Sequence, residues 1–327
     1  MVSKVFVTGA DGMLGNHVVR ELLRQHYNVK AFVLPNGPVA TLSNLNIEIA
    51  KGNILDLIEI NQNISDCDIV IHIAASTSVW PTSHNAGSKV NIEGTKNVFE
   101  AALNAKVKKV IYVGTANSFG AGLIDSLGNE NSVYSADKYH LDYMDSKREA
   151  QNVVESYKNK IHYAVINPTC MFGAYDSYIG SGAFIEAIYK GKIPFASPGG
   201  KNYVCAKDVA VGIVNAIAKG KDGECYITGN KNLSYKEAFE KIASTLGIKK
   251  SFIVMPKVLV LVYGFLLGLI GTVFSFKPKL SLPLSRIACD DHYYSSEKAI
   301  KELNLPQSPI EEGIIEAITW FKENKIV

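Results

Sequence analysis

The stretch KVFVTGADGMLG near the N-terminus constrains the fold more than any other part of this sequence. It predicts a short apolar strand over Lys4–Thr8, a tight turn containing Gly9, Gly12 and Gly15, and an amphipathic helix over Met13–His26. A strand that enters a helix through a glycine turn is typical of the first unit of a parallel α/β sheet. Because the positive end of the helix dipole adjoins the turn, the stretch predicts a site for the diphosphate of a dinucleotide.

The alternation of strands and helices continues to about residue 170. Further strands are predicted at Val29–Leu34, Ile47–Ala50, Asp68–Ala74, Lys109–Gly114 and His162–Asn167, and further helices at Ser88–Ala105 and Ser135–Tyr157. Nearly continuous apolar strands that alternate with helices indicate a parallel sheet covered on both faces. After residue 168 the alternation loosens, and a short strand and a helix are predicted at Cys225–Thr228 and Ser234–Leu246.

We therefore expect an α/β fold with two unequal parts. Residues 1–172 are predicted to form a doubly wound, Rossmann-type NAD(P)-binding domain, to which residues 203–232 return. A smaller, mostly helical lobe that binds the substrate is expected from residues 173–202 and 233–327.

Composition narrows the classes of function. The chain has 34 basic and 31 acidic residues, a net charge of +3, and no basic block that would indicate nucleic-acid binding. Its five cysteines form no CxxC pair, and an odd number argues against a disulfide framework. We expect a cytoplasmic protein that has no signal peptide, because a strand begins by residue 4, and that has no metal site.

The segment Val258–Phe276 stands out because its 19 residues carry no charge, and Lys257, Lys277 and Lys279 flank it. Its length would suffice to cross a bilayer. Two other interpretations remain open, namely a helix that lies on a membrane surface and a helix buried in the second lobe or covering a substrate. Either of these two makes an apolar substrate pocket the natural expectation.

A second motif, YMDSK, places Tyr143 and Lys147 four residues apart, on one face of a predicted helix. A tyrosine phenol titrates near 10, and a neighbouring ammonium group, together with an oxidised nicotinamide, favours the phenolate. Such a pair can exchange a proton with an oxygen atom whose carbon gains or loses hydride. Tyr134 and Lys138 share this spacing, but they lie at the start of the predicted helix.

The motifs and their order resemble those of extended short-chain dehydrogenases/reductases, over almost the whole chain. The matching segments are TGADGMLG, GNILD, VIHIAAS, VNIEGTKNVFEAA, VIYVGTANSFG, YMDSKREA, INPTCMFG and KDVAVGIVNAI. The resemblance implies that Tyr143 is the family's tyrosine, because Ser146, Lys147 and Ala150 fit the family pattern and the rival pair does not. It also implies that Thr115 orients the substrate oxygen toward Tyr143, and that Lys147 tunes Tyr143 and grips the nicotinamide ribose.

The resemblance also implies a set of cofactor contacts. The expected positions are Gly9, Asp11, Gly12, Met13, Leu14, Gly15, Leu34, Asn36, Asn53, Ile54, Ala74, Ala75, Asn91, Tyr143, Lys147, Pro168 and Met171. Asn53 stands where the family usually has an aspartate facing adenine. Asn91 either contacts the nucleotide or serves the structure alone. Asn167 replaces a common family arginine, so the contacts at that point differ from the pattern.

The choice between NAD and NADP depends on the end of the second strand. An acidic residue there would hold a ribose diol, and an arginine would accept a 2′-phosphate. This chain has Leu34, Pro35 and Asn36, so neither signal is present. With no acidic group there to repel a phosphate, the sequence leans slightly to NADP(H).

Within the family, the chain is similar to the dihydroflavonol 4-reductase-like and 3β-hydroxysteroid dehydrogenase-like branch, which implies a bulky apolar substrate. The primary hypothesis is an NAD(P)-dependent oxidoreductase that interconverts a secondary alcohol and a ketone. A nucleotide-sugar epimerase with retained NAD is the alternative, although Arg286 is the only arginine in the substrate half. A non-catalytic NAD(P)-binding protein is a third hypothesis. The helix with Tyr143 often pairs with its twin in this family, which makes a homodimer plausible.

Overall fold

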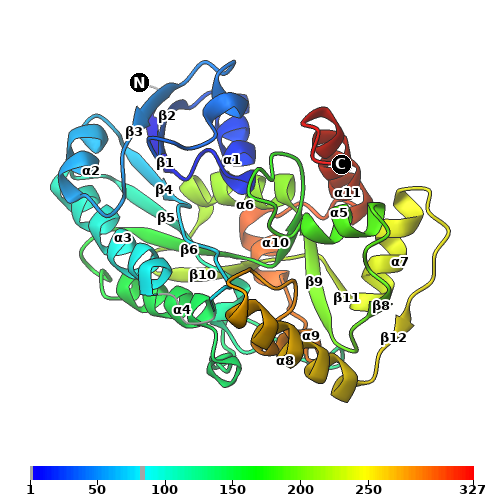
Figure 1. The fold of residues 1–327 in the computed structure, drawn as a ribbon. Coiled ribbons are helices and arrows are strands. Elements are labelled where there is room, and N and C mark those ends of the chain that lie inside the picture. The colour runs from blue at the N-terminus through cyan, green and yellow to red at the C-terminus, as the bar shows by residue number, and fades with distance from the viewer. Residues whose placement is uncertain (1–2, 82–84) are drawn as a thin grey trace.

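The computed structural model describes residues 3–81 and 85–327, which fold around a seven-stranded parallel sheet (Figure 1). In chain order its strands are β1 (Lys4–Thr8), β2 (Asn28–Val33), β3 (Glu48–Lys51), β4 (Ile69–His72), β5 (Lys109–Val113), β6 (Tyr163–Pro168) and β10 (Glu224–Thr228). Across the sheet they run β10-β6-β5-β4-β1-β2-β3. The order therefore reverses between β1 and β4, which is the doubly wound arrangement that the sequence predicts.

Helices cover both faces of this sheet (Figure 1). One face carries α1 (Met13–Arg24), α6 (Ala206–Lys219) and α10 (Glu297–Leu303), and the other carries α2 (Leu57–Ile64), α3 (Asn85–Asn104) and α4 (Asp142–Glu155). Side chains of β1 alternate between the two cores, so that Val5 and Val7 pack on the α1 side and Phe6 on the α3 side. Burial on both faces explains why the strands are almost entirely apolar.

A second, smaller sheet lies beside the first. It contains β7 (Cys170–Phe172), β9 (Gly200–Cys205), β11 (Lys231–Ser234) and β13 (Asp291–His292), and a two-stranded pair joins β8 (Phe195–Ala196) to β12 (Ile253–Val254). The helices α5 (Ala183–Tyr189), α7 (Tyr235–Thr245) and α11 (Ile310–Glu323) pack around it. Ser234 and Glu237 form a capping box at the start of α7, which defines where that helix begins.

The helix that carries Tyr143 begins later than the sequence predicts. α4 starts at Asp142 rather than at Ser135, and a single 3-10 turn, η3 (Asp137–Tyr139), precedes it. His140 follows that turn with φ +52°, a left-handed conformation that a continuous α-helix does not contain. The helical periodicity of the sequence does not reveal this break, because the residues around it pack on α9 (Leu282–Ala288) instead of continuing the helix.

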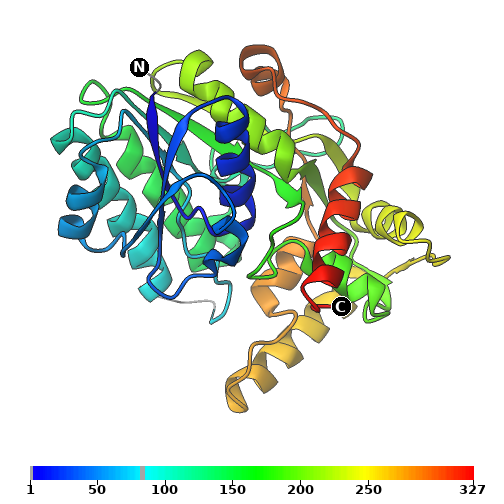
Figure 2. The same ribbon diagram turned by 90° about the horizontal axis from the view of Figure 1, so that it is seen from above.

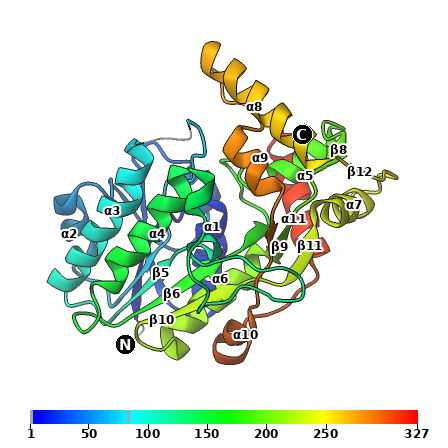
Figure 3. The same cartoon turned by 90° about the horizontal axis from the view of Figure 1, so that it is seen from below.

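The apolar segment near residue 260 forms α8 (Lys257–Val273), which projects from the body of the protein (Figures 2 and 3). No helix in the described part of the chain combines the length and the apolarity that crossing a membrane needs. The expectation of a buried helix is also wrong for most of its surface, because Val258 is 68% exposed and Phe265 is 53% exposed. α8 touches the body where it packs on α9, and where the ring of Tyr263 meets that of Phe195 in β8 edge to face.

Candidate active site

The glycine turn lies at the edge of the sheet where the strand order reverses. Gly9 has φ +69°, and a methyl group added to it would lie 2.7 Å from the backbone nitrogen of Ala74, at the end of β4. A methyl group on Gly15 would lie 2.1 Å from the carbonyl oxygen of Gly9. Only glycine at both positions lets the turn fit between α1 and the end of β4.

The N-terminus of α1 is suited to a phosphate group. Its N-cap residue is Gly12, whose lack of a side chain leaves the first amide groups of the helix uncapped, and its first turn contains no acidic residue. Met13 is half-buried and Leu14 is buried. Uncapped amides at the positive end of a helix dipole bind anions, so the residues of this turn fit the diphosphate of a dinucleotide cofactor.

A buried chain of hydrogen bonds that the sequence does not signal supports this edge. Thr8 Oγ1 lies 2.7 Å from Nδ1 of His72 and accepts hydrogen bonds from the amides of Ile73 and Ala74. The other ring nitrogen of His72 lies 3.1 Å from Thr95 Oγ1. Burial lowers the pKa of His72 to about 3, so the ring is neutral at physiological pH. These hydrogen bonds hold the residues before Ala75 close to the glycine turn.

The loop after β2 brings Leu34 and Asn36 to the same edge, and Leu34 is exposed. Beside this loop lies the carboxylate of Asp11, because a methyl group added to Gly37 would lie 2.5 Å from Asp11 Oδ2. Tyr178, from the second lobe, donates a hydrogen bond of 3.1 Å to the same carboxylate oxygen. Residues 34–36 contain no acidic group. The structure nevertheless places the carboxylate of Asp11, from the glycine turn, beside this loop.

Two predicted contacts after β3 have different surroundings. Asn53 is exposed, and its side-chain oxygen accepts a hydrogen bond of 3.0 Å from the amide of Leu55. Ile54 is buried against α3, since a methyl group on Gly94 would lie 2.5 Å from Ile54 Cδ1. Ile54 therefore packs the core beneath the loop, and Asn53 stands at its surface.

Asn91 uses its amide group within the protein. Its side-chain oxygen accepts from the amide of Ser76, and its nitrogen donates to the carbonyl of Ser76 and to Ser146 Oγ. Both of its amide protons are thus engaged. Of the two roles that the sequence leaves open, the structure shows the structural one, which ties the loop after β4 to α4.

Thr115 and Tyr143 lie together at the end of β5. The Thr115 hydroxyl is within hydrogen-bonding reach of the Tyr143 phenol. Tyr143 is half-buried and packs against an apolar cluster that includes Met144 and, from α9, Ile287. Lys147, one turn further along α4, is only 4% exposed and donates a hydrogen bond of 2.9 Å to the carbonyl of Val113. The phenol and the ammonium group therefore face the same end of β5, as their spacing on the helix predicts.

The electrostatics of the phenol differ from the sequence-based prediction. Burial raises the pKa of Tyr143, and the ammonium group of Lys201 and the Thr115 hydroxyl oppose that rise. Burial lowers the pKa of Lys147 to about 7. The sequence-based prediction is that Lys147 stabilises the phenolate. In the structure, the cation that opposes the rise in the pKa of Tyr143 is Lys201, which lies on β9 and within hydrogen-bonding reach of Tyr235.

Asn167, which stands in place of the family's arginine, supports Thr115. Its side-chain oxygen accepts a hydrogen bond of 3.1 Å from the backbone amide of Thr115. Pro168 ends β6 and is buried, and Met171 is half-buried in β7. Asn167 therefore holds the end of β5 in place, a role that only contacts distant in sequence reveal.

The rival pair is separated by its partners. Tyr134 lies outside α4 and donates a hydrogen bond of 2.6 Å to Asp145, whereas Lys138 pairs with Asp290 at 3.1 Å.

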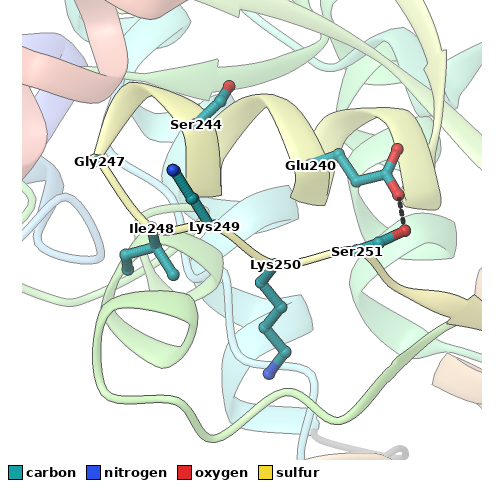
Figure 4. Close-up of a pocket in the computed structure, with 7 residues that line it drawn as sticks. All are labelled: Glu240, Ser244, Gly247, Ile248, Lys249, Lys250 and Ser251. Atoms are coloured by element: carbon teal, nitrogen blue, oxygen red, sulfur yellow. Dashed lines mark hydrogen bonds between the residues drawn. The ribbon is translucent and has the colours of Figure 1, made fainter.

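Figure 4 shows a surface pocket of about 510 Å³ at the end of α7, where Glu240 accepts a hydrogen bond from Ser251. Its lining comes from residues 240–251 and includes none of the predicted site residues.

Relatives of known name cover the chain from end to end. A protein of Synechocystis sp. provisionally named dihydroflavonol 4-reductase is 26% identical over 100% of this chain and 97% of its own length. Sterol demethylase protein B of Methylococcus capsulatus is 24% identical over 98% of this chain and 99% of its own length.

Solved structures share the whole fold. The crystal structure of gox2253 superposes with a TM-score of 0.86 at 26% identity, covering 98% of both chains. A UDP-glucose 4-epimerase of Thermus thermophilus in complex with NAD has a TM-score of 0.78 and covers 98% of this chain and 99% of its own, but at 19% identity this likeness shows the fold alone. The profile of the NAD dependent epimerase/dehydratase family matches residues 5–229. The resemblance inferred from the motifs is thereby confirmed, and the chain belongs to the NAD dependent epimerase/dehydratase family, as an oxidoreductase of that family.

Proposed function

We propose that this protein interconverts a secondary alcohol and a ketone on a bulky apolar substrate. The observation that carries this proposal is the juxtaposition, at the end of β5, of the phenol of Tyr143, the hydroxyl of Thr115 and the buried amine of Lys147. A nicotinamide cofactor whose diphosphate is held at the glycine turn would supply or accept the hydride. The protein's own groups then need only handle the proton and orient the oxygen.

Each group has a distinct role in this proposal, and that of the Lys147 amine would be to hold the ribose next to the nicotinamide. In the oxidative direction, the hydroxyl proton of the alcohol passes to Tyr143 as the carbon loses hydride, and the carbonyl forms. In the reductive direction, Tyr143 returns that proton to the oxygen as the carbon gains hydride. Thr115 donates a hydrogen bond that orients the oxygen, and Asn167 keeps Thr115 in place through its backbone amide. The cation of Lys201 opposes the rise in the phenol's pKa, which keeps proton exchange accessible.

The surroundings of Tyr143 support an apolar substrate. Tyr143 packs against a buried cluster that contains Leu141, Met144 and Ile287 and against which Leu284 also packs. The names of the two relatives above refer to a dihydroflavonol and to a sterol, both of which are bulky ring compounds. Arg286 is the single arginine of the second lobe, which gives little support for a sugar diphosphate.

We further propose that NAD(H) is preferred to NADP(H), against the slight lean of the sequence. In this fold the ribose of the adenosine half lies at the end of the second strand. The Asp11 carboxylate lies beside Gly37 in that loop, and its charge would repel a 2′-phosphate. Substitution Asp11→Asn should narrow the preference for NADH over NADPH by about tenfold, equivalent to about 1.4 kcal/mol. Fluorescence titration with both reduced cofactors measures the ratio.

The reaction is tested with a panel of apolar ketones and alcohols, assayed with both cofactors by the absorbance of the reduced nicotinamide. Tyr143→Phe should abolish turnover and retain cofactor binding, because the ring stays and only the proton carrier is lost. Tyr134→Phe is the matched control, since that phenol bonds to Asp145 and should be dispensable. Turnover of UDP-sugars alone, without net change in the cofactor, would favour the epimerase and refute the proposal.

A further inference from the structure

The projecting helix α8 leaves a broad apolar face uncovered. Only Val260, Gly264 and Gly271 are buried along it; Gly264 packs against Ser285 of α9, and Gly271 packs against Phe276 and Pro278 of the segment that follows α8. On the other sides Phe265, Leu266 and Leu269 are each about half-exposed, at 53%, 49% and 52%. Soluble proteins rarely leave contiguous apolar patches of this kind in water, and such patches mark contact surfaces.

The charged residues of the segment that contains α8 all have one sign. From Lys241 to Arg286 the sequence contains seven basic residues and no acidic residue. At the N-terminal end of α8, Lys257 pairs with Asp290. Beyond its C-terminal end, Lys277 and Lys279 are exposed and form no ion pair within residues 3–81 and 85–327. An uncovered apolar helix with unpaired cations next to it is complementary to a layer whose interior is apolar and whose surface is anionic.

A second copy of the chain fits this surface less well. Symmetric pairing of two α8 helices would bring like charges together, because residues 241–289 contain no acidic residue and Asp290, which follows them, already pairs with Lys257 and Lys138. Insertion across a bilayer is also disfavoured. The 17 residues of α8 span about 25 Å, less than the roughly 30 Å of a hydrocarbon core.

We propose that α8 and the lysines beside it dock this protein on the surface of a membrane that contains anionic lipids. The helix lies along the membrane, with its apolar face among the acyl chains and Lys277 and Lys279 among the headgroups. Its base rests on α9, where Gly264 packs against Ser285, and Leu284 of α9 packs on the same apolar cluster as Tyr143. This arrangement brings the candidate site close to the membrane interior, in which an apolar substrate dissolves. The inference about the substrate rests on the proposed function.

The test is cosedimentation of the full chain with vesicles, in low salt. One set of vesicles contains phosphatidylcholine alone, and the other contains phosphatidylcholine mixed with phosphatidylglycerol. A triple variant, Phe265→Gln, Leu266→Gln and Leu269→Gln, removes the apolar face with a residue that favours helix. The matched control changes three exposed apolar residues on other surfaces: Ile58→Gln, Leu123→Gln and Ile315→Gln.

Wild type and control should bind the anionic vesicles, and the triple variant should bind at least about tenfold less. The double variant Lys277→Gln, Lys279→Gln should lose about fivefold per lysine on anionic vesicles and nothing on neutral ones. Circular dichroism and binding of NADH show that each variant is folded.

Three results would overturn the docking surface. They are wild type that stays in the supernatant with both kinds of vesicle, a triple variant that sediments like wild type, and a dimer that the triple variant splits while neither form binds lipid. Because vesicle binding is measured without a substrate, its failure is distinguishable from failure of the proposed reaction.

Discussion

Lys147→Met should make the cofactor-free protein more stable while it abolishes turnover. Lys147 is 4% exposed, and burial lowers the pKa of its amine from 10.5 to about 7. In the unfolded chain the amine keeps a pKa near 10.5. Between these two pH values the unfolded chain holds a proton that the folded protein has released. The free energy of unfolding therefore rises with pH across this window, and below about pH 7 the folded protein bears the full cost of a buried charge.

The size of this cost follows from the two pKa values. A pKa that falls from 10.5 to about 7 corresponds to about 5 kcal/mol. Methionine has a similar length and cannot ionise, but it loses the hydrogen bond to the carbonyl of Val113, which contributes about 1 kcal/mol. At pH 7 the variant should therefore be more stable than wild type by about 4 kcal/mol, an advantage that vanishes as the pH approaches 10.

Urea unfolding followed by far-ultraviolet circular dichroism, at several pH values across this window, measures the difference. Lys158→Met serves as the control, because that lysine is exposed beyond α4 and its loss should leave the pH dependence unchanged. Parallel stability curves for wild type and Lys147→Met would refute the reasoning, since they would mean that the buried amine keeps its ordinary pKa.

Three further substitutions test the site. Gly15→Ala, whose methyl group would lie 2.1 Å from a backbone oxygen, should lower the free energy of unfolding by about 2 kcal/mol or more, whereas Gly12→Ala, at 3.6 Å from the same atom, should change it by less than about 0.5 kcal/mol in thermal unfolding. Asn167→Ala leaves a buried amide at the end of β5 without its acceptor, so kcat should fall by about tenfold, and an unchanged kcat would contradict its positioning role. Lys201→Met removes the cation that opposes the rise in the pKa of Tyr143, the proposed proton carrier, so the pH–rate profile should move to higher pH, while Lys231→Met, exposed on β11, should not move it.

The central sheet could be predicted from the sequence because its cause is local. Strands buried on both faces must be apolar almost throughout, and β1 was predicted with the bounds that the structure shows. The start of α4 could not be predicted in this way. Periodicity continues through residues 135–141, and only contacts with α9 explain why the backbone breaks at His140.

The site shows the same division between local and distant causes. That Tyr143 and Lys147 share a face follows from helical geometry. The glycine turn follows from the positive φ at position 9, which only glycine adopts without strain. The cation that acts on the phenol was not predictable, because Lys201 reaches it from another sheet. The sequence predicts that Asp11 contacts the cofactor. Its carboxylate can influence the choice between NAD and NADP only because the loop after β2 folds back beside it.

The amino-acid sequence by itself determined the strand–turn–helix order, the glycine turn and the residues that face one way along α4, since short-range sterics and burial dictate them. The tertiary structure alone decided which distant charges and hydrogen bonds surround Tyr143, and that α8 stands uncovered instead of buried. An apolar stretch in a sequence indicates a segment that avoids water. Whether other protein segments or a membrane cover it depends on how the rest of the chain packs.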